Sequence, residues 1–309
     1  MNISNCRRTR HGRARAAIGG LALTLAGAYL STASAAEVTG FARGETSQPY
    51  PINGVPLLDS FHFRFFQHEM NVEDVVVLPA SPIPPCNGCL DVPEGQIILG
   101  IFDHLATLEE EDEYFFRISH ADLPASVFRH RISEICRGSC GQWLNRPSRD
   151  SVFVITGFRF HFTHGDHHLK RVAIWEENGA LTVHFADDNG DDQFRYELEY
   201  VYLPPEMIPI RGHVAGVGAR GSARATIDLG PVTPGPTVLR GFDLIFQKEV
   251  NDWGDDKEDQ EIREIGVRTP ANRVEVFFAN DKGSAFDWGV DWGALSRLPI
   301  FVPNPPRAP

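Results

Sequence analysis

The sequence of 309 residues predicts an all-β protein made of three degenerate antiparallel four-stranded repeat units, packed as β-sandwich-like modules. Composition is the first observation behind this prediction: 21 Phe and 22 Pro against 3 Met favour strands and turns over helical bundles. The second is that apolar and polar residues alternate with a period of two over many short segments, as in half-buried strands.

The central unit, 152–203, carries the clearest pattern. Asn178-Gly179 supplies the turn of a tight hairpin, and a second polar turn spans 187–192. We therefore expect a four-stranded antiparallel meander with one apolar and one charged face. The apolar positions of its four strands are Phe158, Phe160 and Phe162; Val172 and Ile174; Leu181, Val183 and Phe185; and Phe194, Tyr196, Leu198 and Tyr200.

Weaker copies of this pattern lie on both sides. Phe242, Leu244 and Phe246 repeat the first strand 84 residues later, and Phe61, Phe63 and Phe65 open a more divergent copy before it. The predicted organisation is a signal peptide over 1–36, a β unit with a cysteine loop over 37–125, a second unit over 126–204, and a spacer, third unit and proline-rich tail over 205–309.

The segments between the copies allow two kinds of packing. The spacers could add strands to each unit, or the three sheets could pack on one another as repeat units do. The segment 223–229 is typical of a strand and favours the first arrangement. We expect a short helix over 126–136, with Ile132 and Ile135 buried, and a flexible linker over 216–221.

The first 36 residues are typical of a bacterial secretory signal peptide. A basic region with five Arg precedes an apolar stretch over 16–30, and Ala33-Ser34-Ala35 fits a cleavage site. The apolar stretch is too short for a stable membrane span. We therefore expect a periplasmic or extracellular protein. The mature chain keeps 24 basic and 41 acidic residues, a net charge of −17, which disfavours nucleic acid as a partner and suits solubility.

Four cysteines remain after the signal peptide, as the close pairs Cys86 with Cys89 and Cys136 with Cys140. In an oxidising compartment disulfides are the expected state, and four cysteines allow three pairings that the sequence does not distinguish. A zinc site is the alternative.

Histidine and acidic residues form two candidate metal sites. The first is the run His161, His164, Asp166, His167 and His168, which could bind a transition metal. We favour a solvated turn there, because the spacing matches no standard metal motif and the third copy has no histidine in the matching stretch. The second is a candidate calcium loop, for which a solvated loop is again the favoured interpretation. Its oxygen ligands would be Asp187, Asn189 and Asp191.

Tryptophan supplies the third kind of candidate site, because exposed Trp side chains stack on sugar rings. Trp175 lies on the polar phase of its strand, and Trp253 lies in an acidic loop with Asp255 and Asp256, so these four residues are candidate ligand contacts. Trp288 and Trp292 fall on the apolar phase and are expected in the core.

These features favour an exported, non-catalytic binding or structural β-repeat protein that recognises carbohydrate or a cell-surface partner. The alternative is a secreted metal-dependent or carbohydrate-active hydrolase, with calcium or a transition metal as its cofactor. The sequence has none of the GxSxG, SxxK or HExxH motifs that identify hydrolases. Function is therefore expected in the residues that differ between the copies.

Overall fold

The computed structural model is described for 35–50, 54–66, 72–80, 90–102, 113–123, 127–163, 168–187, 192–229, 235–247, 261–270 and 272–296. All of these residues belong to one compact unit, 30–300. Within the described chain, no helix combines the length and the apolar character needed to cross a membrane.

Eighteen strands and one short 3-10 helix, η1 (Pro205–Met207), make up the described chain. The first six strands are β1 (Ala35–Ala42), β2 (Thr46–Pro49), β3 (Val55–Phe65), β4 (Asp74–Pro79), β5 (Gln96–Phe102) and β6 (Tyr114–Leu123). The next six are β7 (Arg129–Arg137), β8 (Ser139–Trp143), β9 (Val152–Phe162), β10 (Leu169–Glu177), β11 (Ala180–Asp187) and β12 (Gln193–Leu203). The last six are β13 (Ile210–Gly218), β14 (Ser222–Thr226), β15 (Thr237–Phe246), β16 (Ile262–Arg268), β17 (Arg273–Asn280) and β18 (Phe286–Ala294).

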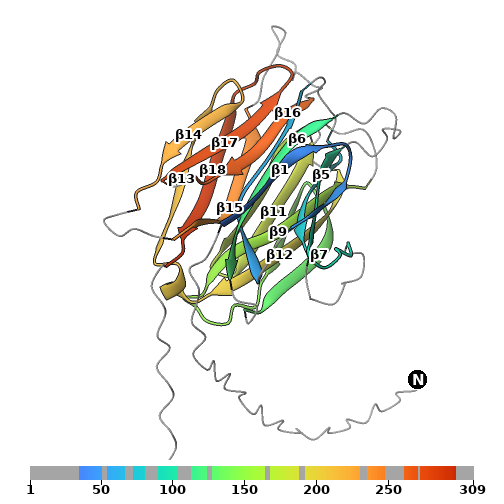
Figure 1. Ribbon diagram of the computed structural model, residues 1–309. Coiled ribbons are helices and arrows are strands. Elements are labelled where there is room, and N and C mark those ends of the chain that lie inside the picture. The colour runs from blue at the N-terminus through green and yellow to red at the C-terminus, as the bar shows by residue number, and fades with distance from the viewer. Residues whose placement is uncertain are drawn as a thin grey trace, which may run out of the picture. The chain divides into compact units, whose positions relative to one another are not determined.

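The strands form antiparallel sheets, as expected for the all-β class. One sheet has six strands in the order β1-β6-β3-β16-β17-β14, and Figure 1 shows its blue and orange strands from distant parts of the chain. A twelve-stranded sheet holds the others, but β7 and β8 are joined only by the pair Arg137 and Ser139 across their turn. We therefore describe this sheet as two halves, and call the three groups the first sheet, the second sheet (β7-β12-β9-β4-β5-β2) and the third sheet (β13-β18-β15-β10-β11-β8).

The pairing pattern recurs every six strands. If six is added to each strand number of the first sheet, the strand order of the second sheet results, and adding six again gives the order of the third sheet. In this count β1 follows β18, so that β16 of the first sheet corresponds to β4 of the second and β10 of the third. Each run of six strands therefore contributes three strands to one sheet and three to a neighbouring sheet. This differs from the meander expected for each unit: β9 pairs with β12 and β4, whereas β10 and β11 pair with each other and with β15 and β8.

The apolar faces of the three sheets meet in one core. Phe61, Phe158 and Phe242, from β3, β9 and β15, have ring centroids 5.0 to 5.6 Å apart. Trp288 and Trp292 are buried in this core, as the alternation predicts. Both kinds of packing that the sequence allowed are thus present, because the spacers add strands and the sheets also pack on one another.

A β-bulge interrupts the same strand in each run of six. The register of β3, β9 and β15 shifts at Asp59, Thr156 and Arg240, which turns the following residues to the opposite face. Before the bulge, Leu57, Val154 and Val238 therefore belong to a second, smaller apolar cluster. The bulges set which residues of these strands reach the outer faces.

Three local expectations are wrong. The segment 126–136 contains strand β7 and no helix among its described residues, and Ile135 is 50% exposed. The predicted linker 216–221 contains the end of β13, where glycine leaves room for large rings: Gly216 faces Trp288 and Gly218 faces Phe286. The polar turn at 187–192 joins strands that are not paired, since β11 and β12 lie in different sheets.

Candidate functional site

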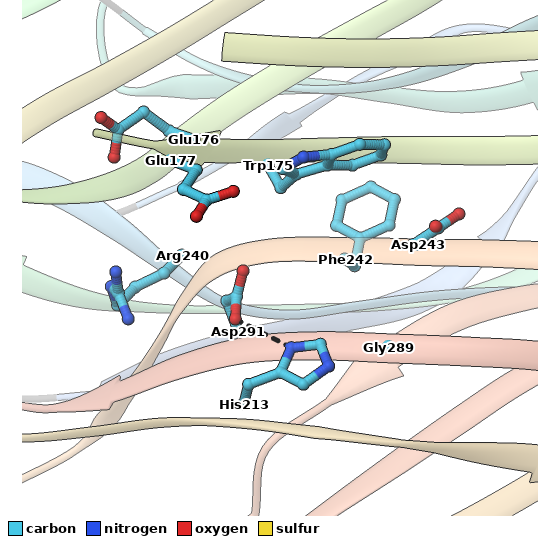
Figure 2. Close-up of a pocket in the computed structure, with 9 residues that line it drawn as sticks. All are labelled: Trp175, Glu176, Glu177, His213, Arg240, Phe242, Asp243, Gly289 and Asp291. Atoms are coloured by element: carbon cyan, nitrogen blue, oxygen red, sulfur yellow. Dashed lines mark hydrogen bonds and ion pairs between the residues drawn. The ribbon is translucent and has the colours of Figure 1, made fainter. Parts of the chain in front are cut away.

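A groove of about 440 Å³ opens on the outer face of the third sheet, across β10, β13, β15 and β18. Figure 2 shows its side chains, which mix one tryptophan with charged groups of both signs. The residues lining the groove are Trp175, Glu176, Glu177, His213, Arg240, Phe242, Asp243, Gly289 and Asp291.

Trp175 forms the aromatic wall of the groove. It lies on the outward-facing phase of β10, as its place in the alternation predicts, and is half-buried. The ring of His184 in β11 stacks on it with centroids 5.3 Å apart, and the guanidinium of Arg171 lies 5.6 Å from its ring centre. Burial and the nearby Arg171 lower the pKa of His184, which keeps this imidazole neutral at neutral pH. The Trp175 ring is therefore held in place from two sides.

Two carboxylates of the groove are held by cationic or titratable neighbours. Arg171 donates to Asp243 from Nε over 2.9 Å and from its terminal nitrogen over 2.7 Å, a two-pronged ion pair between β10 and β15. Asp291 lies 3.0 Å from Nδ1 of His213, across β18 and β13. Each carboxylate keeps further lone pairs, so both can accept hydrogen bonds from a ligand.

Arg240 brings a positive charge to the other end of the groove. It is the bulge residue of β15, and the bulge directs its side chain toward Glu176 and Asp291. Burial lowers the pKa of Arg240, while Asp291 acts in the opposite direction. Its Nε is buried without a hydrogen-bond partner in the described chain. This atom is closed to solvent, so Arg240 contributes to the groove through its positive charge.

Gly289 explains why the groove is open. It pairs with Asp243, and the pairing pattern puts Glu197 at the same position in the second sheet and Arg117 at that position in the first. Glu197 fills its site: it accepts from Nε of Arg131 over 2.5 Å and from the backbone N–H of Leu90 over 3.1 Å. The groove is thus a place where the third sheet lacks a side chain that the other sheets possess.

Next to Gly289, Arg171 and Asp243 form an ion pair, and each of the other two sheets has a pair of interacting side chains at the same two positions. Arg171 and Asp243 in the third sheet correspond to Asp74 and Arg159 in the second, where Nε and a terminal nitrogen of Arg159 donate to Oδ2 over 3.0 and 2.6 Å. In the first sheet the corresponding contact joins Glu264 and His62 over 2.6 Å. The pair therefore belongs to the framework, and the open space beside it is particular to the third sheet.

Only part of the candidate metal site lies in the described residues, and its role in metal binding stays a prediction. His161 is in β9 of the second sheet with Nδ1 3.3 Å from Asp74. His168 precedes β10, and Asp187 is 1% exposed at the end of β11. His164, Asp166, His167, Asn189 and Asp191 lie outside the described residues.

Cys136 and Cys140 form a disulfide across the turn between β7 and β8. Glu134 lies near them, and these three residues form the one group in the described part of the chain whose geometry could suit a metal. The disulfide occupies both sulfurs, so the group cannot supply thiolate ligands in this state. Cys86 and Cys89 lie outside the described residues, as do Trp253, Asp255 and Asp256.

Of the residues that line the groove, only Trp175 was predicted from the sequence as a ligand contact, and this role stays a prediction. His213 was missed because it lies in the spacer before the third unit, where no site was expected. Gly289 and Asp291 could have been found by aligning the polar positions of the last strand of each unit, where Gly289 replaces Glu197. Arg240 carried no signal, because a bulge changes the face on which a residue lies and the alternation does not show it.

No family model matches the chain, and no curated protein matches it. Among solved structures, a protein of the Sulfolobus turreted icosahedral virus has 8% identity and a TM-score of 0.13, over 87% of this chain and 92% of that one. A protein of infectious bursal disease virus, Gt strain, has 8% identity and a TM-score of 0.13, over 86% of this chain and 82% of that one. Likeness at this level carries no argument about function.

Proposed function

We propose that this protein is an exported, non-catalytic binding protein whose groove on the third sheet recognises carbohydrate. The observation that carries the proposal is the arrangement of Trp175 beside fixed donors and acceptors in one open groove. An aromatic wall offers apolar contact to the C–H face of a sugar, while carboxylates, imidazole and guanidinium bind its hydroxyl groups.

The ion pairs support ligand binding. Asp243 and Asp291 are each oriented by a partner, which pre-organises them as acceptors at low entropic cost. Arg240 adds a positive charge at the same site. The N-terminus resembles a signal peptide, which supports export. An exported protein meets the glycans of cell surfaces and of the surroundings.

The test is a glycan array probed with the mature chain, followed by calorimetry on the retained sugars. Trp175→Ala should weaken binding roughly tenfold or more, by loss of the apolar wall. Phe128→Ala is the matched control, since Phe128 is 74% exposed and does not line the groove. Absence of binding to every glycan, or equal binding by Trp175→Ala, would contradict the proposal. Release of shorter sugars from a bound glycan would favour the hydrolase instead.

A further inference from the structure

A second tryptophan lies on the same outer face as the groove. Trp143 ends β8, the strand at the other side of the third sheet, and is 79% exposed. It pairs with Ala180 of β11, which in turn pairs with Glu177 of β10, a residue of the groove. Because directly opposite residues of neighbouring strands point to the same side of a sheet, Trp143 shares a face with Trp175.

The surface between the two tryptophans carries small side chains. Gly141 and Thr182 are opposite one another in the same row as Trp175, and Ala180 lies in the row of Trp143. A Cβ added at Gly141 would meet no atom within 4 Å, so the space above it is open. The face between Trp143 and the groove is thus low enough for a ligand to lie across it.

The separation of the two tryptophans sets the size of that ligand. Trp143 and Trp175 are two strands apart and offset by two residues, which places their Cα atoms about 12 Å apart from strand spacing and rise. One hexose ring cannot contact both side chains. A chain of linked sugars can, because successive rings repeat the same apolar faces along its length.

Both tryptophans are particular to the third sheet. The pairing pattern puts Pro49 and Thr226 at the position of Trp143 in the other sheets, and Leu78 and Arg268 at the position of Trp175. The framework therefore does not require an aromatic residue at either place. An exposed tryptophan without a packing role is typical of a binding surface.

We infer that Trp143 forms a second subsite, and that the ligand class of the groove is a linear oligosaccharide bound across β8, β11 and β10. This inference rests on the proposed function, because it extends the same site. The two subsites predict a dependence on chain length: short sugars occupy the groove alone, and longer ones also contact Trp143.

The test is calorimetry with cello- and chito-oligosaccharides, from the monosaccharide to the hexasaccharide, on the mature chain. The wild type should gain affinity with length until both subsites are filled. Trp143→Ala should bind the shortest ligands unchanged and lose roughly tenfold for the hexasaccharide. Trp143→Phe should recover part of this loss, Trp175→Ala should weaken every length, and Phe128→Ala should change none.

The outcomes separate the two proposals. Equal hexasaccharide affinity of Trp143→Ala and wild type overturns the second subsite, even where Trp175→Ala weakens binding and so supports the groove. Failure of every oligomer to bind overturns carbohydrate recognition for these sugars and the second subsite with it. Oxidation of Trp143 by N-bromosuccinimide, followed by peptide mass spectrometry, gives an independent readout: the hexasaccharide should protect this residue and the monosaccharide should not.

Discussion

The ring of Phe61 in β3 lies 5.0 Å from that of Phe158 in β9, edge to face, although 97 residues separate them. Phe242 of β15 completes the contact, at 5.1 Å from Phe61 and 5.6 Å from Phe158. The three rings occupy the same position in the recurring pairing pattern, one from each run of six strands. No run can bury its central aromatic residue alone, so the three should fold as one cooperative body.

Phe158→Ala should destabilise this whole body. Removal of a fully buried Phe costs about 3–5 kcal/mol, through lost burial and the cavity left behind. Urea unfolding followed by tryptophan fluorescence and by circular dichroism should show a single transition shifted to lower urea. Phe128→Ala, which alters an exposed ring, should leave the midpoint nearly unchanged. The fragment 126–204 should remain unfolded by itself, and a cooperatively folded fragment would contradict the shared core.

Stability should fall at mildly acidic pH because of His120. This residue is fully buried in β6 with Nδ1 2.9 Å from the hydroxyl of Tyr50, and burial lowers its pKa to about 3. In the unfolded chain a histidine has a pKa near 6.5, so below this pH the unfolded state binds a proton at His120 and the folded state does not. The stability that neutral His120 contributes is present above about pH 6.5 and is lost as the pH falls toward about 3, by up to about 1.4 kcal/mol per pH unit.

His120→Gln isolates this effect, because an amide can keep the bond to Tyr50 and does not titrate. Urea unfolding between pH 6.5 and 5 should show a smaller pH slope for the variant than for the wild type, by about half a proton at pH 6.5 and close to one proton at pH 5. Other titrating groups contribute equally to both proteins, so the difference between the two slopes reports His120. Equal slopes would show that His120 is not the residue responsible.

Alternation along the chain predicted the strands and the buried face well, because burial on one side imposes a period of two. The hairpin at Asn178-Gly179 is confirmed by φ values of 54° and 92°, which this turn requires. Pairing partners were not predictable, since alternation shows that a face is buried but not against which strand. The sequence therefore gives β9 and β10 as neighbours, whereas they lie in different sheets. The same limit hid the groove, which is assembled from β10, β13, β15 and β18.

The buried ion pair of Arg131 and Glu197 in the second sheet should make the folded protein strongly sensitive to the loss of either partner alone. Arg131 and Glu197 have side chains 4% and 2% exposed, and Arg131 also lies 3.5 Å from Glu199. Arg131→Met leaves Glu197 buried without this cation, whereas Glu199 keeps Arg129 at 3.6 Å, and the change should cost about 3–5 kcal/mol. Adding Glu197→Leu should recover part of this loss, because the unpaired charge is removed. A double-mutant cycle from urea unfolding measures the coupling, and purely additive effects would contradict it.

Gly289→Glu should close the groove and abolish glycan binding without unfolding the protein. The same position holds Glu197 in the second sheet, so the framework accommodates a glutamate there. A Cβ at Gly289 would lie 3.1 Å from Cε1 of His213, the outer end of an exposed side chain that can move aside. The rest of the glutamate side chain would then occupy the space between Trp175 and Asp291.

Gly289→Ala is the graded control, because one methyl group displaces His213 slightly and leaves most of the groove free. Calorimetry should therefore show near wild-type affinity for Gly289→Ala and no measurable binding for Gly289→Glu, while both variants melt within a few degrees of the wild type. Full binding by a folded Gly289→Glu protein would mean that the ligand lies elsewhere on the molecule. Loss of binding in both variants would point to the orientation of His213, rather than the open space, as the feature the ligand needs.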